Sequence, residues 1–134
     1  MSRAAERGAV AVEFAILAPV LVMLLLGIME FGRAYNVQTS LTNAAREGVR
    51  VMAIDNNQAA ALTSTKNAAD TLSPKLTNSN ITIAFQTIPS TTPAPTSCAP
   101  GSQVTVTIKY SLSTMTGIAG PFAMTGKGTM LCGG

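Results

Sequence analysis

Residues 7 to 33 read RGAVAVEFAILAPVLVMLLLGIMEFGR, and this stretch decides the fold. From Ala9 to Met29 the sequence has 21 residues, of which only Glu13 is charged. A helix of that length rises about 1.5 Å per residue and reaches roughly the 30 Å of a bilayer's hydrocarbon core. The stretch therefore predicts a transmembrane helix, and it raises the question of why a carboxylate lies inside it.

Two other interpretations of the apolar run fit less well. As a cleaved secretory signal, MSRAAERG would be the basic n-region, but the run exceeds a usual h-region and no small-x-small site follows Met29. As the core helix of a soluble protein, it would need apolar surroundings that the rest of the chain does not supply. Pro19 lies within the run, where a lipid-embedded helix tolerates proline better than a soluble one.

The composition leaves room for one modest domain beside this span. The chain has 134 residues, 47% of them hydrophobic and only 11% charged, and it contains no Trp and no His. Its net charge of +3 comes from nine Lys and Arg spread thinly along the sequence, a pattern without the dense basic patch that nucleic-acid binding requires. We expect a thin-cored domain that binds no nucleic acid.

The helical pattern continues beyond the membrane. Apolar residues recur there at intervals of three or four positions: Val37, Leu41, Ala45, Val49 and Met52. One helix is therefore predicted from about Ala9 to Ile54, roughly 70 Å long, half in lipid and half outside. Arg3 and Arg7 precede the span and Arg33 follows it, so the positive-inside rule narrowly favours a cytoplasmic N-terminus.

The remaining residues predict a small α+β unit. Asn56 and Asn57 suit a helix cap, and QAAALTSTKNAADTLSPKL predicts a second helix, ended by Pro74. Its apolar face would comprise Leu62, Ala69, Leu72 and Leu76. ITIAF and QVTVTIKYSL alternate as half-buried strands, with inward residues in the longer one at Val104, Val106, Ile108, Tyr110 and Leu112. A third strand is expected within 123–132, and a Pro/Thr/Ser-rich loop, 89–102, separates the first two.

The two cysteines, Cys98 and Cys132, both lie outside the predicted span. An even number of cysteines in an oxidising compartment predicts a disulfide, which on the chain-entropy account stabilises the domain by about 4 kcal/mol. Two unrelated free thiols are the alternative. A zinc site is disfavoured, because the chain has no His and no CxxC pair.

No group of residues predicts enzymatic chemistry. The sequence offers no histidine base, no nucleophile elbow and no phosphate-cradling glycine loop, and Asp55 and Asp70 are isolated polar positions. Lys127, between the glycines of TGKGT, is interpreted as a solvated strand residue. We expect no catalytic residues, no cofactor and no small-molecule substrate.

At this point the ordered motifs resemble a known family, the TadE-like pseudopilins of the tight-adherence (Tad/Flp) type IV pilus system. The matching features are Gly8 followed by a small residue and an apolar helix, the pair Glu13-Phe14, LAP at 17–19, EFGR at 30–33, and NAAREGVR at 43–50. The resemblance covers roughly residues 7 to 54. The Pro/Thr/Ser loop carrying a cysteine is unlike most of the family.

The resemblance implies an answer to the question of Glu13. A prepilin peptidase would cut between Gly8 and Ala9 on the cytoplasmic side, which makes Glu13 the fifth residue of the mature chain. Burying a charge in the membrane costs roughly 2.5 to 3.5 kcal/mol, so a partner must offset it. The family's partner is the new α-amine of a neighbouring subunit, and Glu13 and Phe14 become assembly residues. Alternatively, Glu13 simply stays hydrated at the cytoplasmic interface.

The expected protein is thus an α+β, pilin-like chain in the bacterial cell membrane. Its parts would be a cytoplasmic leader (1–8), a transmembrane helix (9–30), an extracytoplasmic continuation of that helix (31–55), and a small domain with three or four antiparallel strands (56–134). As a minor pilin, its partners would be other pilin subunits, the pilus assembly machinery, the prepilin peptidase and the lipid bilayer. A single-pass envelope protein that binds a partner without entering a filament is the alternative, and a major pilin is a weaker third option.

Overall fold

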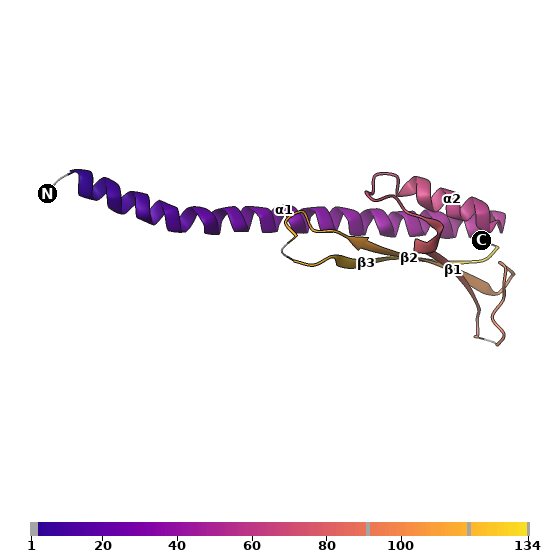
Figure 1. The fold of residues 1–134 in the computed structure, drawn as a ribbon. Helices are drawn as coiled ribbons and strands as arrows, with labels where there is room; N and C mark the ends of the chain where they lie inside the picture. Colours follow the sequence, from indigo (N-terminus) through magenta and orange to yellow (C-terminus); the bar gives the residue numbers. More distant parts are fainter. Residues whose placement is uncertain (1–2, 91, 118, 134) are drawn as a thin grey trace.

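The computed structural model describes residues 3–90, 92–117 and 119–133. Residues 1 and 2 of the expected leader and residue 91 of the expected loop lie outside this range. The structure is a long helix with a small domain wrapped around its second half (Figure 1). The predicted α+β architecture is confirmed, with a second helix and a three-stranded antiparallel sheet.

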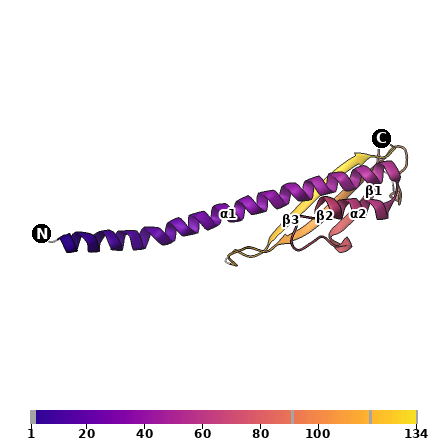
Figure 2. The ribbon, with the colours of Figure 1, turned by 90° about the horizontal axis from the view of Figure 1, so that it is seen from above.

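Helix α1 runs from Arg3 to Asp55, 53 residues without interruption. It curves gently along its indigo-to-violet first third, the part that contains Pro19 (Figures 1 and 2). Proline removes one helical hydrogen bond and commonly bends a helix. The helix ends where Asn56 takes a positive φ of 47° and donates its backbone N–H to the carbonyl of Met52 at 3.1 Å. Asparagine tolerates this left-handed conformation better than most residues.

Helix α2, Gln58–Ala68, begins as the sequence indicates. Asn57 is its N-cap, and the Asn57 side chain accepts the backbone N–H of Ala60 at 3.0 Å. Such a cap satisfies one of the unpaired donors of the first helical turn. The buried residues of α2 are Ala61 and Thr65.

The predicted extent of this second helix is wrong. The helix stops at Ala68, and the chain then turns through backbone bonds such as Leu72 N–H to Ala69 at 3.0 Å. Asp70 and Thr71 have low helix propensity, and Ser73 is disfavoured in the helical conformation because it precedes Pro74. The apolar residues after the helix are nevertheless buried, in irregular structure: Ala69, Leu72 and Leu76.

The sheet contains β1 (Ile81–Thr87), β2 (Ser102–Leu112) and β3 (Phe122–Leu131), in the order β1-β2-β3. A single 3₁₀ turn, η1 (Asn78–Asn80), leads into β1. Both pairs are antiparallel, with Ile81 opposite Ile108 in the first and Val106 opposite Gly128 in the second. The loop between β1 and β2 is 88–101, shifted by one residue from the expected 89–102, because β1 ends at Thr87 and Ser102 is buried and begins β2.

The core lies between the outer half of α1 and the inner face of β2. All five residues predicted to point inward from β2 are buried: Val104, Val106, Ile108, Tyr110 and Leu112. They face the helical stripe of Leu41, Ala44, Ala45, Val49, Met52 and Ala53, which is also buried. Lys109 and Lys127 are exposed on the opposite face of the sheet, as expected for solvated strand residues.

Two glycines of β3 allow the helix to lie directly on the sheet. A Cβ added at Gly126 would come within 2.6 Å of the carbonyl carbon of Leu41, and one at Gly128 within 2.7 Å of the carbonyl oxygen of Ala45. Any side chain there would push the strand away from α1. Glycine is unfavourable inside a strand, but at these two positions it allows β3 to pack directly against α1.

Candidate functional site

The N-terminal half of α1 carries the residues for which a functional role is expected. Gly8 and Ala9 lie in its exposed helical part, and a side chain added at Gly8 would meet nothing within 4 Å. Glu13 and Phe14 follow one turn later and are both exposed, Phe14 to 68%. The structure therefore leaves all four residues free of contacts with the outer domain.

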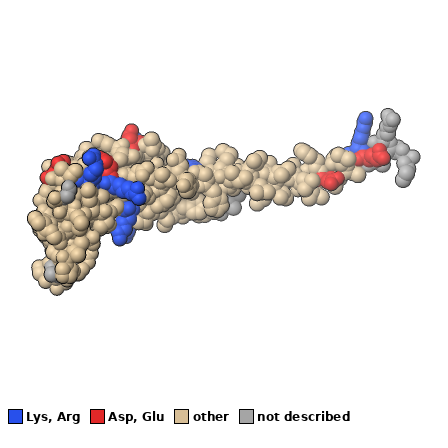
Figure 3. Space-filling view, turned by 180° about the vertical axis from the view of Figure 1, so that it is seen from behind, with Lys and Arg blue, Asp and Glu red and all other residues tan. Residues whose placement is uncertain are grey.

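These residues lie in or next to a stretch of α1, residues 9–29, that is apolar on every side except at Glu13. We call this stretch the shaft. Its most hydrophobic 18-residue window has a mean hydropathy of 2.6 and no part of it is buried, so α1 is long and apolar enough to cross a membrane. Figure 3 shows the shaft as an almost unbroken tan surface between the charged residues of the domain and those near the N-terminus. A helix that is apolar all round fits lipid or other apolar helices rather than water.

Glu13 has no ion pair and no hydrogen bond of its side chain within the residues that the structure describes. Among the described residues, the ion pairs are Glu47 with Arg50 and Asp70 with Lys75, both in the outer part of the molecule. No hydrogen bond reaches the Glu13 carboxylate from any part of the chain that the structure describes. A carboxylate in an apolar environment is costly unless a partner offsets its charge, and the described part of the outer domain does not supply one.

The EFGR motif, residues 30–33, joins the shaft to the domain. Glu30 is only 8% exposed, and both its carboxylate oxygens accept the backbone N–H of Met115, at 3.1 and 3.0 Å. One turn later, the Arg33 Nη1 donates to the carbonyl of Ser113 at 2.9 Å. From the sequence, Arg33 entered the charge count across the predicted span and EFGR the resemblance to the family, but neither indicated a contact with the domain. Their signal was a pair of opposite charges placed immediately after an apolar run.

The NAAREGVR motif, residues 43–50, packs α1 against its neighbours. Gly48 is buried, and a side chain there would collide with the hydroxyl of Thr65, so this glycine lets α2 approach α1 closely. On the exposed side, Arg50 donates to both carboxylate oxygens of Glu47 at 3.1 and 2.9 Å. The hydrogen bond from Arg50 lowers the pKa of Glu47, as expected for a carboxylate beside a guanidinium.

Cys98 and Cys132 are joined by a disulfide, with their Cα atoms 5.2 Å apart. It ties the loop before β2 to the end of β3. Asn56 supports the same loop, because its side chain accepts the backbone N–H of Cys98 at 2.9 Å and donates to the carbonyl of Cys98 at 3.2 Å. The turn at the end of α1 is thus fastened to the disulfide by two hydrogen bonds that the sequence did not indicate.

The described residues offer no metal centre, since no group of three or more Cys, Asp or Glu side chains comes together in them. The loop residues of the Pro/Thr/Ser segment are mostly exposed and carry no titratable group between Pro89 and Ser97.

Comparison with known proteins places the motifs in one family. Residues 8–50 match the family described as TadE-like protein. No curated protein and no solved structure matched the chain. The matched region begins at Gly8, includes Glu13 and EFGR, and ends with NAAREGVR, so it covers the shaft and the part of α1 that packs on the domain. Over residues 8–50, about a third of its length, the chain is therefore similar to the TadE-like proteins, a family associated with pili.

Proposed function

We propose that this chain is a minor pilin, or pseudopilin, that takes part in assembling or initiating a Tad/Flp-type pilus for surface adherence. The observation that carries the proposal is the unpartnered Glu13 in an apolar helix, inside the segment that matches the TadE-like family. In an assembly, the positive partner would be the free α-amine of a neighbouring subunit. Its other partners would be pilus subunits, the assembly machinery and the lipid bilayer.

That amine has to be produced by cleavage. The proposed reaction is hydrolysis of the Gly8–Ala9 peptide bond by a prepilin peptidase, which leaves Ala9 as the first residue. Gly8 lies in open space with no contact to the domain, so a peptidase has access to the junction without unfolding the rest of the chain. In this topology residues 9–30 cross the cell membrane, the N-terminus is cytoplasmic, and residues 31–134 are extracytoplasmic.

The mass of the mature protein tests the proposal. Protein purified from the bacterial envelope should begin at Ala9, and Gly8→Leu should keep the residues that precede it. Gly27→Leu is the matched control, because Gly27 also has open space around it but lies far from the junction, and it should be processed normally. A wild-type chain that retains residues before Ala9 would instead favour an envelope protein that is anchored by its helix and enters no filament.

A further inference from the structure

The loop between β2 and β3 returns along α1 toward the N-terminus. It is the part of the domain that reaches furthest in that direction in two perpendicular views (Figures 1 and 2). We define the hairpin tip as residues 113–117 and 119–121. Two contacts hold it on the helix: the Met115 N–H with the carboxylate of Glu30, and the Ser113 carbonyl with the guanidinium of Arg33.

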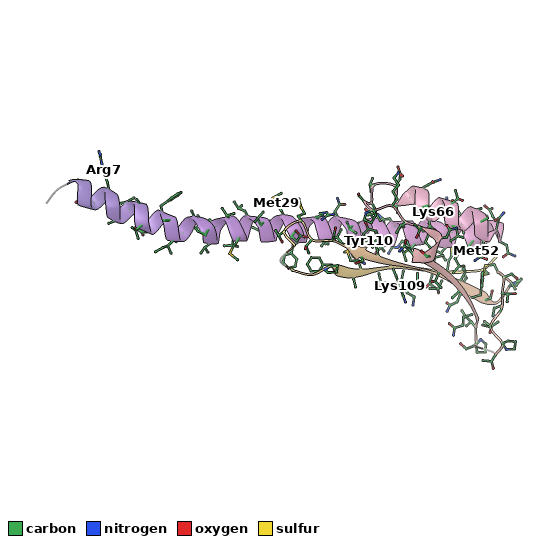
Figure 4. The ribbon with its side chains drawn as sticks, viewed as in Figure 1. Arg7, Met29, Met52, Lys66, Lys109 and Tyr110 are labelled. Carbon is green, nitrogen blue, oxygen red and sulfur yellow. A yellow bond between two sulfur atoms is a disulfide. The ribbon has the colours of Figure 1, made fainter. Side chains whose placement is uncertain are left out.

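These contacts fix the level of the tip relative to the apolar shaft. Glu30 directly follows Met29, the last residue of the apolar run. Figure 4 shows Met29 where the end of the hairpin lies beside α1. If residues 9–29 cross a bilayer, the tip therefore stands at the membrane surface, on the side where the domain lies.

The chemistry of the tip matches that position. From Tyr110 to Gly126 the sequence has no charged residue. Met115 is 63% exposed, and every other described residue from 116 to 121 is exposed as well. On α1, Phe31 and Tyr35 are close in sequence to Glu30 and Arg33, which contact the tip, and are 74% and 77% exposed. Tyrosine, like tryptophan, is enriched where a membrane protein meets the headgroups.

The position of Glu30 at the end of the apolar run explains why this carboxylate is buried. A carboxylate next to the hydrocarbon region is costly unless hydrogen bonds satisfy it. The tip covers Glu30 and supplies a backbone donor to it, so the helix leaves the apolar region with its first acidic residue already shielded.

We infer that the hairpin tip docks on the headgroup region of the lipid bilayer and thereby sets the depth and tilt of the outer domain. The occupant of this surface is lipid, because the tip has no charged residue of its own and lies where the apolar run of α1 ends. The inference rests on insertion of α1 in the membrane, and otherwise goes beyond the proposed role in pilus assembly.

The absence of tryptophan from the chain makes a direct test available. Three full-length single-tryptophan variants are compared in phosphatidylcholine vesicles whose acyl chains carry bromine near the headgroup. Met115→Trp reports on the tip, and Phe31→Trp is the reference on α1 at the same level. Ile88→Trp is the control, because Ile88 is 54% exposed beyond the other end of the sheet. Bromine should quench Met115→Trp to an extent comparable with Phe31→Trp and several-fold more than Ile88→Trp.

Each other outcome overturns the inference. Quenching of Phe31→Trp but not of Met115→Trp means that the tip stands clear of lipid. No quenching of either means that α1 does not insert, a failure of the proposed topology that the reference variant identifies. Blue-shifted Met115→Trp emission without quenching, lost on dilution into excess lipid, means that a second copy covers the tip. Ala119→Trp replaces Met115→Trp if that variant does not fold.

Discussion

Glu30 and Met115 are 85 positions apart in the chain, yet both carboxylate oxygens of Glu30 accept the Met115 backbone N–H, at 3.1 and 3.0 Å. This contact closes the end of the β2–β3 hairpin onto the helix where the apolar shaft ends. It converts a charged residue at the edge of a membrane span into a buried, satisfied acceptor.

Removing the acceptor should loosen the hairpin. Glu30→Ala leaves the Met115 N–H without its partner, a loss that typically costs about 1–3 kcal/mol of unfolding free energy. Thermal unfolding in detergent micelles should show a lower midpoint, and a protease should cut the hairpin tip faster. Glu47→Ala removes a partly exposed carboxylate of the same helix whose surface ion pair with Arg50 contributes little, so it should change both much less. Unaltered stability and proteolysis of Glu30→Ala would show that the contact does not hold the tip.

The glycines of β3 should not tolerate a side chain. Gly126→Ala places a methyl group 2.6 Å from the Leu41 carbonyl carbon, so β3 and α1 must separate. Overpacking of this kind typically costs about 1–3 kcal/mol, which a denaturant titration resolves. Gly120→Ala is the matched control, because that methyl group meets nothing within 4 Å. Equal stabilities of the two variants would contradict direct contact between strand and helix.

The disulfide between half-buried Cys98 and buried Cys132 should contribute strongly to the stability of the domain. Cys98 and Cys132 are 34 positions apart, so the chain-entropy account predicts a loss of about 4 kcal/mol in Cys132→Ser. Reductant should lower the unfolding midpoint of the wild type toward that of the variant and leave the variant unchanged. Ready alkylation of both thiols in envelope-purified protein, without reductant, would mean that the bridge does not form in the cell.

Tyr110 should make the folded domain less stable at high pH. Burial raises the pKa of its phenol, an effect that nearby Arg33 partly offsets, and its hydroxyl donates to the Pro74 carbonyl at 2.9 Å. The unfolded chain therefore releases this proton at a lower pH than the folded one, and stability should fall as the pH rises past about 10.

Ultraviolet titration can isolate this residue, because the chain has two tyrosines. In Tyr35→Phe, Tyr110 is the remaining phenol, and its phenolate absorbance should develop with a midpoint above that of a tyrosine model peptide measured in parallel. In Tyr110→Phe the late step should be missing. A midpoint equal to that of the peptide would mean that water reaches the Tyr110 hydroxyl.

Replacing Glu13 should separate the assembly of the protein into pili from its insertion in the membrane. Glu13→Gln keeps the shape of the side chain but removes the charge that would pair with a neighbour's α-amine, so the processed protein should insert in the membrane and fail to co-purify with pilus subunits. Insertion should survive because the span becomes more apolar. If Glu13 only stays hydrated at the interface, the variant strain should make normal pili and the pairing hypothesis is wrong.

The sequence by itself determined the elements whose information is local. The unbroken apolar run and the stripe from Val37 to Met52 specify one long helix. A run that is apolar all round fits a helix in lipid, and residues spaced by three or four positions mark the face of a helix that meets the core. The alternation of β2 specified its buried face in the same way. In the segment after Ala68 this reasoning failed, since apolar spacing alone does not tell a buried helix turn from a buried irregular turn.

Only the tertiary structure decided the contacts between elements. The hydrogen bonds of Glu30 with Met115 and of Asn56 with Cys98, and the approach of Gly126 to Leu41, join positions at least 42 apart in the chain. Periodicity identifies the apolar face of a helix or strand, but it contains no information on which distant backbone donor or acceptor will meet that face. Those pairs are set by how the sheet seats on α1, a packing geometry that exists only once the whole chain has folded.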